Sequence, residues 1–235
     1  MALQSLLFSR DPEIISLAGE VLKSLDIEVS QCTAAPEAVR KLTATKFDTI
    51  IVDNADVHGA ISVLSAAKSL ATCDQSVGIV LAVSTTSLGL AEGARCHMVV
   101  YRPLSADRLR NGIKSALGLR GDGEDARESR RTSINIPATL RGAGLDEMLV
   151  FITNLSAGGA ALQVGPSIPS SSIHSIEFSL PGKDDNLGAS VELVWRDVQG
   201  RVGVRFVGMS AAFSESLEKW LAEQSASQPS SKASA

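Results

Sequence analysis

The sequence predicts two domains: an α/β domain with a doubly wound, five-stranded parallel sheet, followed by an antiparallel β domain that ends in a helix. Residues 1–118 alternate short apolar runs with longer segments of helical period, which is typical of α/β proteins. Residues 132–224 lose this period and show short β-rich runs between turn residues. The stretch between them, 119–131, carries glycine, mixed charges and several arginines, so we expect a linker.

Five strand-plus-helix units make up the first domain. The expected strands are LQSLLF (3–8), DIEVSQC (26–32), FDTIIVD (47–53), VGIVLAV (77–83) and CHMVVY (96–101). The expected helices are PEIISLAGEVLKSL (12–25), APEAVRKLTAT (35–45), GAISVLSAAKSL (59–70), SLGLAEGA (87–94) and SADRLRNGIKSAL (105–117). Consecutive units of this kind give parallel strands with helices on both faces of the sheet.

Six short runs with strand character make up the second domain, which the pattern predicts to be an antiparallel barrel or sandwich. They are INIPATLR (134–141), EMLVFITNL (147–155), GAALQV (159–164), IHSIEFSL (173–180), ASVELVWRDV (189–198) and RVGVRFVGM (201–209). A helix at 210–223 follows, with four apolar residues spaced for one face: Phe213, Leu217, Trp220 and Leu221. Residues 225–235 are rich in Ser and Ala, so we expect a disordered tail.

The composition is that of a folded protein, with 44% hydrophobic and 20% charged residues. The formal net charge of -4 argues against a general nucleic-acid binder, because binding to a phosphate backbone needs a basic surface. Cys32, Cys73 and Cys96 are odd in number and lack C-x-x-C spacing. They predict neither a disulfide framework nor a zinc site, and we expect reduced thiols in the core.

The N-terminal stretch MALQSLLFSRDPE has an apolar run too short to span a bilayer, and Arg and Asp follow it. We therefore expect a first strand, a cytoplasmic location and no membrane insertion. His58, His97 and His174 are isolated from any partner that would form a metal site or an acid/base pair. The expectation is a protein without enzymatic activity, without a bound metal and without a cofactor.

The first domain resembles the receiver domain of two-component response regulators. Asp53 ends the third expected strand, FDTIIVDN, where that family keeps its phosphoacceptor carboxylate and where open α/β sheets bind ligands. The family also holds a divalent cation with an acid pair after the first strand, but here Ser9 and Arg10 stand at those positions. Arg102 replaces the family's lysine after the fifth strand.

These departures predict a pseudo-receiver, in which Asp53 is not phosphorylated and pairs with Arg10 or Arg102. A modified but active phosphoacceptor is the alternative. Receivers commonly associate through their last helix and strands, so the resemblance also allows a homodimer through this domain.

The linker and second domain, from Ala126 to Glu223, resemble a PilZ domain, the bacterial receptor module for cyclic di-GMP. The family's R-x-x-x-R motif is matched by Arg127 and Arg131, with Arg130 adjacent. Its D/N-x-S-x-x-G motif is matched by NLSAGG, where the defined positions are Asn154, Ser156 and Gly159. The resemblance implies a barrel rather than a sandwich.

The chemistry of cyclic di-GMP suits these residues. The arginine fork can bind both N7 and O6 of guanine, and also phosphate, so Arg127, Arg130 and Arg131 are candidate ligand-binding residues. Ser156 can donate from its hydroxyl, and Asn154 can accept guanine N–H groups. The remaining candidates are Gly158 and Gly159, which lack side chains and so let a base approach the backbone.

Plainer interpretations stay open for each feature. NLSAGG is also what a simple turn requires, and acids at 124, 125 and 128 suit a solvated linker. Trp195 is expected in the barrel core, with stacking on a base as the alternative.

The sequence thus predicts a signalling effector that binds cyclic di-GMP. Ligand would order the linker, fix the two domains and change the surface offered to an unidentified protein partner. The alternative is an adaptor in which both degenerate domains act only as interaction surfaces, independently of nucleotide. A regulator driven by phosphorylation of Asp53 is a third interpretation.

Overall fold

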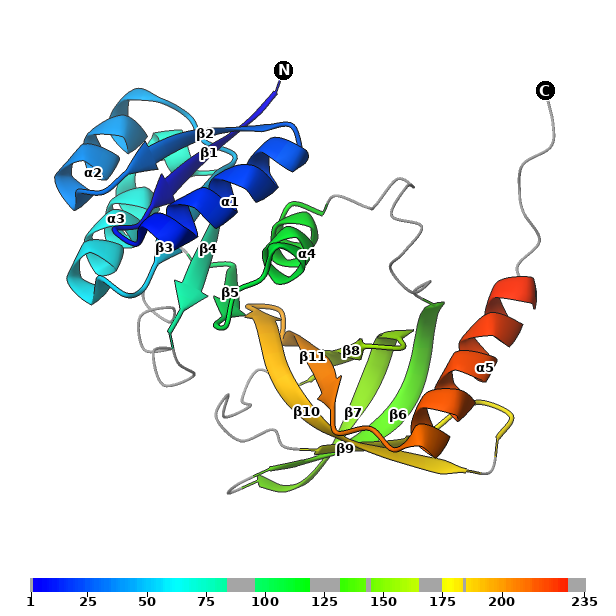
Figure 1. Ribbon diagram of the computed structural model, residues 1–235. Helices are drawn as coiled ribbons and strands as arrows, with labels where there is room; N and C mark the ends of the chain where they lie inside the picture. Colours follow the sequence, from blue (N-terminus) through cyan, green and yellow to red (C-terminus); the bar gives the residue numbers. More distant parts are fainter. Residues whose placement is uncertain are drawn as a thin grey trace, which may run out of the picture. The chain divides into compact units, whose positions relative to one another are not determined.

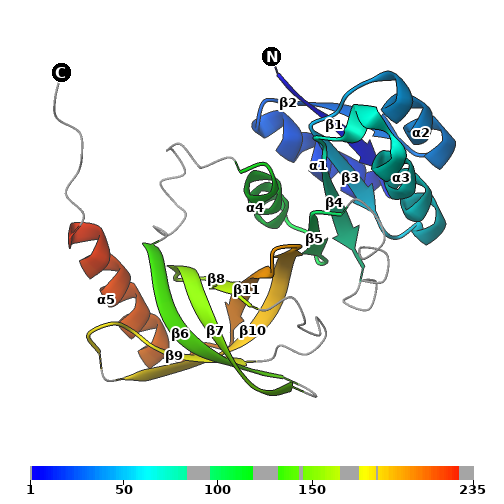
Figure 2. The same ribbon diagram turned by 180° about the vertical axis from the view of Figure 1, so that it is seen from behind.

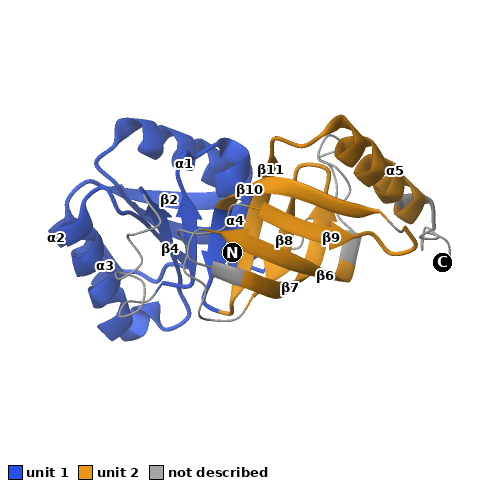
Figure 3. Ribbon diagram, turned by 90° about the horizontal axis from the view of Figure 1, so that it is seen from below, with its two compact units in different colours: residues 1–122, 194–198 blue, residues 123–193, 199–235 orange. Residues whose placement is uncertain are grey.

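The computed structural model describes residues 2–83, 96–118, 132–142, 145–164, 175–183 and 185–227. The chain divides into two compact units (Figure 3). Unit 1 contains residues 1–122 and 194–198, and unit 2 contains residues 123–193 and 199–235.

Unit 1 is built on strands β1 (Leu3–Phe8), β2 (Ile27–Cys32), β3 (Thr49–Asp53), β4 (Val77–Ala82) and β5 (Met98–Tyr101). They follow the order β2-β1-β3-β4-β5, with parallel pairing between neighbours. Strand β3 is buried along its whole length, which is why its sequence is almost continuously apolar. This strand order is that of the receiver type of α/β fold, so the receiver-like character predicted for the N-terminal half is confirmed.

The helices of unit 1 are α1 (Pro12–Ser24), α2 (Ala35–Ala44), α3 (Val57–Ser69) and α4 (Ala106–Ala116), with a short 3₁₀ turn, η1 (Ala71–Cys73). Side chains of Asp11, Asp56 and Ser105 cap α1, α3 and α4 by accepting first-turn N–H groups. Helix α1 packs against α4, and α2 against α3. Figures 1 and 2 show α1 and α3 on opposite faces of the sheet.

Trp195 is not a residue of the barrel core, so that prediction is wrong. Residues 194–198 belong to unit 1, and residues 195–197 among them pair antiparallel with β5. Trp195 packs there against an apolar cluster that includes Met98 and Leu109.

The expected helix at 87–94 lies outside the described residues.

Unit 2 is a six-stranded antiparallel barrel (Figure 1). Its strands are β6 (Thr132–Gly142), β7 (Leu145–Ser156), β8 (Gly159–Gln163), β9 (Ser175–Ser179), β10 (Asn186–Asp197) and β11 (Arg201–Val207). Residues 186–193 of β10 belong to unit 2, and the rest of the strand belongs to unit 1. They pair in the order β11-β8-β7-β6-β9-β10, and β11 also pairs with β10, which closes the barrel. The choice that the residue pattern left open between barrel and sandwich is therefore resolved.

The C-terminal helix α5 (Ala211–Ser227) completes the barrel core. The four residues predicted to share its apolar face are all buried in that core: Phe213, Leu217, Trp220 and Leu221. The indole of Trp220 also donates from Nε1 to the carbonyl oxygen of Pro181 at 3.2 Å. Helix α5 continues through residues 225–227 of the predicted tail, and residues 228–235 lie outside the described part of the chain.

The three cysteines are buried and unpaired, as the sequence predicts. Burial raises the pKa of the Cys96 thiol to about 11. Within the described residues, no helix is long and apolar enough to cross a membrane.

Candidate functional site

Asp53 lies at the carboxyl end of β3, where its side chain is 2% exposed. Both of its carboxylate oxygens accept hydrogen bonds. The Ser9 hydroxyl donates to Oδ2 at 2.8 Å, while Arg102 Nη2 and the backbone N–H of Ala55 donate to Oδ1 at 2.9 Å and 3.1 Å. The charge of the buried carboxylate is therefore balanced by a protein side chain.

Arg102 is the predicted partner that makes this contact. Its Nη1 also lies 3.4 Å from Asp11 Oδ2, so one guanidinium joins two carboxylates. Burial by itself lowers the pKa of Arg102, but its hydrogen bonds and charge contacts with Asp53 and Asp11 outweigh burial and raise that pKa. Arg10, the other predicted partner, pairs instead with Asp56 at 3.2 Å.

The arrangement around Asp53 suits a structural carboxylate better than a phosphoacceptor. Transfer of a phosphoryl group to an aspartate needs a free carboxylate oxygen and a cation that neutralises the incoming charge. Here both oxygens accept hydrogen bonds, and the Arg102 guanidinium already supplies the positive charge. Among the described residues, no group of three or more His, Cys, Asp and Glu could hold a metal ion.

The NLSAGG stretch forms a tight hairpin between β7 and β8. Ser156 pairs with Gly159 across the turn, and the Ser156 hydroxyl donates to the Gly159 carbonyl oxygen at 3.1 Å. The backbone N–H of Phe206 donates to the Gly158 carbonyl oxygen at 3.0 Å, which ties the turn to β11. The register between β7 and β8 shifts after Ile152, which marks a β-bulge just before Asn154.

The two glycines of the hairpin differ in whether the fold leaves room for a side chain. A Cβ at Gly159 would lie 2.2 Å from the Val204 carbonyl oxygen, so packing against β11 excludes any side chain there. A Cβ at Gly158 would meet nothing within 4 Å, and neither glycine has the positive φ that disfavours other residues. Gly159 is therefore required by the barrel itself, whereas the fold gives no reason for glycine at 158.

The model of the PilZ domain family matches residues 125–223, which span the hairpin and the barrel. These residues are a PilZ domain. The solved PilZ domain of CeSA from a cellulose-synthesizing bacterium is similar to it, with 22% identity over 41% of this chain and 99% of that chain, at a TM-score of 0.34.

Unit 1 has its own similar structures. The receiver domain of the sensor histidine kinase PA1611 from Pseudomonas aeruginosa PAO1 shows 17% identity over 50% of this chain and 99% of that chain, at a TM-score of 0.46. The chemotaxis response regulator CheY4 of Vibrio cholerae shows 16% identity over 49% and 99% of the two chains, also at 0.46. A search of curated proteins finds no match to the chain.

The PilZ domain brings four of the predicted ligand-binding residues together in one hairpin: Asn154, Ser156, Gly158 and Gly159. Asn154 and Ser156 are half-buried, and Gly158 is exposed. The three predicted arginines, Arg127, Arg130 and Arg131, lie outside the described residues. The hairpin therefore supplies the described half of the candidate site.

The predictions from sequence missed one basic residue beside this hairpin. Arg205 of β11 pairs directly with Gly159, so it lies next to the NLSAGG motif although the two are far apart in the sequence. Strand alternation alone predicts that Arg205 faces outward, because Val204 and Phe206 beside it are apolar. It cannot predict which strand β11 pairs with.

Proposed function

We propose that this protein is a signalling effector that binds cyclic di-GMP through its PilZ domain. The PilZ family is a family of cyclic di-GMP receptor modules. The observation that carries the proposal is the NLSAGG hairpin, where Asn154 and Ser156 precede a glycine, Gly158, that the fold does not require. An open Gly158 in a hairpin with polar neighbours is what a ligand that lies on the backbone needs.

The two halves of the site would recognise different groups of the ligand. Cyclic di-GMP has two anionic phosphates and two guanine bases, and arginine forks suit both, which assigns that role to Arg127, Arg130 and Arg131. The Asn154 amide oxygen would accept a guanine N–H. The Ser156 hydroxyl already donates within the hairpin, so toward the ligand it would act as an acceptor or give up that bond.

The proposed mechanism is an order–disorder switch of the linker at 119–131. Its arginines would close over a nucleotide seated on the hairpin, and the two domains would then be fixed relative to each other. The output would be a changed surface for a protein partner. A homodimer through the receiver-like domain is part of the same proposal and is tested by sedimentation with and without nucleotide.

Hydrogen exchange tests the switch most directly. The backbone amides of residues 120–131 should exchange fast in the free protein and slowly when cyclic di-GMP is saturating. The amides of β3, which are buried in either state, provide an internal control. Equal protection of the linker in both states would contradict the mechanism while leaving binding itself intact.

A nucleotide-independent adaptor is the second candidate, and the Asp53 contacts favour it for the receiver-like half. Ser9 and Arg102 already donate to both oxygens of this carboxylate. The domain would therefore act as an interaction surface rather than as a phosphorylation switch. A protein partner that binds equally well with and without cyclic di-GMP would support this candidate.

A further inference from the structure

A row of three residues crosses the outer face of the PilZ barrel beside the turn. Ser156 on β7 and Arg205 on β11 both pair with Gly159 on β8, which lies between them. The residues that alternate with Arg205 point into the barrel core, where Val204 and Phe206 are at most 5% exposed. Arg205 therefore faces outward, on the same face as the candidate nucleotide site.

Nothing but backbone separates Ser156 from Arg205 along this row. Gly159 has no side chain, and a Cβ there would lie only 3.2 Å from the Cα of Arg205. Adjacent strands are about 4.8 Å apart, so the flanking Cα atoms are separated by about 10 Å. A long arginine side chain can bend over the glycine within that distance and reach a group bound on the hairpin.

In the structure, the Arg205 side chain pairs with a residue of β10, on the side of β11 away from the hairpin. Its Nη2 lies 2.6 Å from Glu192 Oε2, and Glu192 belongs to β10, which flanks β11 on the side away from β8. The two side chains are 50% and 47% exposed. Ion pairs this exposed hold weakly, because water solvates both charges when they separate. An anion on the hairpin can therefore compete for the guanidinium.

We propose that Arg205 is a further nucleotide-binding residue and that Glu192 is its counter-ion when no nucleotide is bound. A phosphate of the cyclic dinucleotide replaces the Glu192 carboxylate, and Arg205 exchanges one anionic oxygen partner for another. The Glu192 side chain is already 47% exposed, so water can solvate the displaced carboxylate. This inference rests on the proposed function, and it makes Glu192 a residue that limits affinity.

The two members of the pair then have opposite effects on binding. Arg205→Gln removes a charge-assisted contact with phosphate, so affinity for cyclic di-GMP falls about tenfold. Glu192→Gln removes the competing anion and a repulsive charge, so affinity rises about threefold to tenfold. In the Arg205→Gln background, Glu192→Gln gives less than about a twofold gain, because no guanidinium remains to be released.

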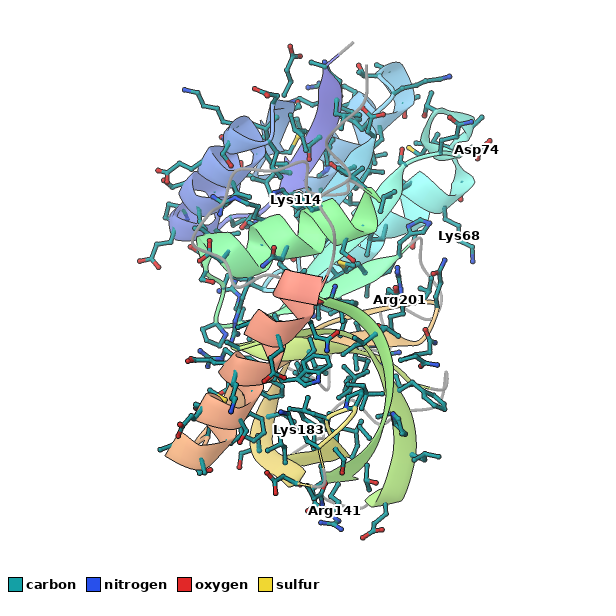
Figure 4. The ribbon with its side chains drawn as sticks, turned by 90° about the vertical axis from the view of Figure 1, so that its right-hand side faces the viewer. Lys68, Asp74, Lys114, Arg141, Lys183 and Arg201 are labelled. Carbon is teal, nitrogen blue, oxygen red and sulfur yellow. The ribbon has the colours of Figure 1, made fainter. Side chains whose placement is uncertain are left out.

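A matched control lies elsewhere on the same barrel. Arg141 forms an exposed pair with Glu147 at 2.8 Å, beside the turn that joins β6 to β7. Figure 4 shows Arg141 at the end of the barrel far from Arg201, the first residue of β11. Glu147→Gln changes the net charge as Glu192→Gln does, about 30 Å along β7 from Ser156, and should leave affinity within about twofold of the parent.

The experiment is isothermal titration of the full chain and the four variants with cyclic di-GMP, together with their melting temperatures. Weaker binding in Arg205→Gln and tighter binding in Glu192→Gln, with Glu147→Gln unchanged, establishes the exchange. The inference is overturned if the parent binds and neither Arg205→Gln nor Glu192→Gln changes the affinity, or if both weaken it alike. Either result leaves the proposed function standing. No binding by the parent removes the proposed function itself.

Discussion

Arg102 donates from Nη2 to Oδ1 of the buried Asp53 across 2.9 Å, where a receiver domain would use a lysine and a bound cation. The same guanidinium reaches Asp11, the residue that caps α1. One arginine thus joins the ends of β3, α1 and β5 through charge contacts. Its guanidinium balances the charge of the buried Asp53 carboxylate in this domain.

The first prediction concerns the stability of the receiver-like domain. Arg102→Gln leaves Asp53 buried without its counter-charge and should lower the free energy of unfolding by about 2 kcal/mol. Arg10→Gln is the control, because the Arg10 side chain that pairs with Asp56 is 65% exposed, and its loss should matter by less than about 1 kcal/mol. Urea unfolding measures both, and equal losses in the two variants would contradict the assignment.

The second prediction is that Asp53 resists phosphorylation. Acetyl phosphate with magnesium should give no phosphoryl adduct in the intact mass spectrum, because Ser9 and Arg102 already engage both carboxylate oxygens. Magnesium-dependent labelling that is lost in Asp53→Asn would restore the phosphorylation-driven interpretation.

The third prediction separates the two glycines of the hairpin. Gly159→Ala pushes a methyl group against the Val204 carbonyl oxygen and should destabilise the barrel by about 1–3 kcal/mol. Gly158→Ala places its methyl group in open space, so the free energy of unfolding should change by less than about 1 kcal/mol. Cyclic di-GMP affinity should nevertheless fall about tenfold in Gly158→Ala, because the methyl group covers the proposed ligand surface.

Thermal unfolding and titration of the same two variants decide this point. A Gly158→Ala protein that binds as tightly as the parent would assign both glycines to the turn alone.

Much of this fold is predictable from sequence because each element has a local signal. The apolar run before Asp53 and the 3.6-residue spacing of Phe213, Leu217 and Trp220 both predict their burial, and the structure shows it. The hairpin at NLSAGG is predictable for the same reason, since Asn, Ser and Gly favour turns.

The parts that sequence could not predict depend on contacts between distant residues. The need for glycine at 159 comes from the Val204 carbonyl oxygen, which only the pairing of β8 with β11 brings close. The position of Arg205 beside the hairpin has the same origin. Trp195 packs against the apolar cluster of unit 1 and not in the barrel core. An apolar residue in a strand predicts burial, but it does not predict which residues it packs against.

Choice of variant matters for a test of the nucleotide site. Ser156→Ala also removes the hydrogen bond from the Ser156 hydroxyl to the Gly159 carbonyl oxygen, so a loss of affinity would mix hairpin geometry with ligand contact. Arg127→Ala changes a linker residue that the R-x-x-x-R motif assigns to the ligand, and it changes no residue of the NLSAGG hairpin.

The most direct test of the central claim is therefore isothermal titration of the full chain with cyclic di-GMP, beside Arg127→Ala. The account predicts a dissociation constant in the micromolar range or tighter for the parent and at least a roughly tenfold loss in the variant. No binding heat at high protein concentration, with no shift in melting temperature when nucleotide is added, would contradict it and leave the adaptor as the better description.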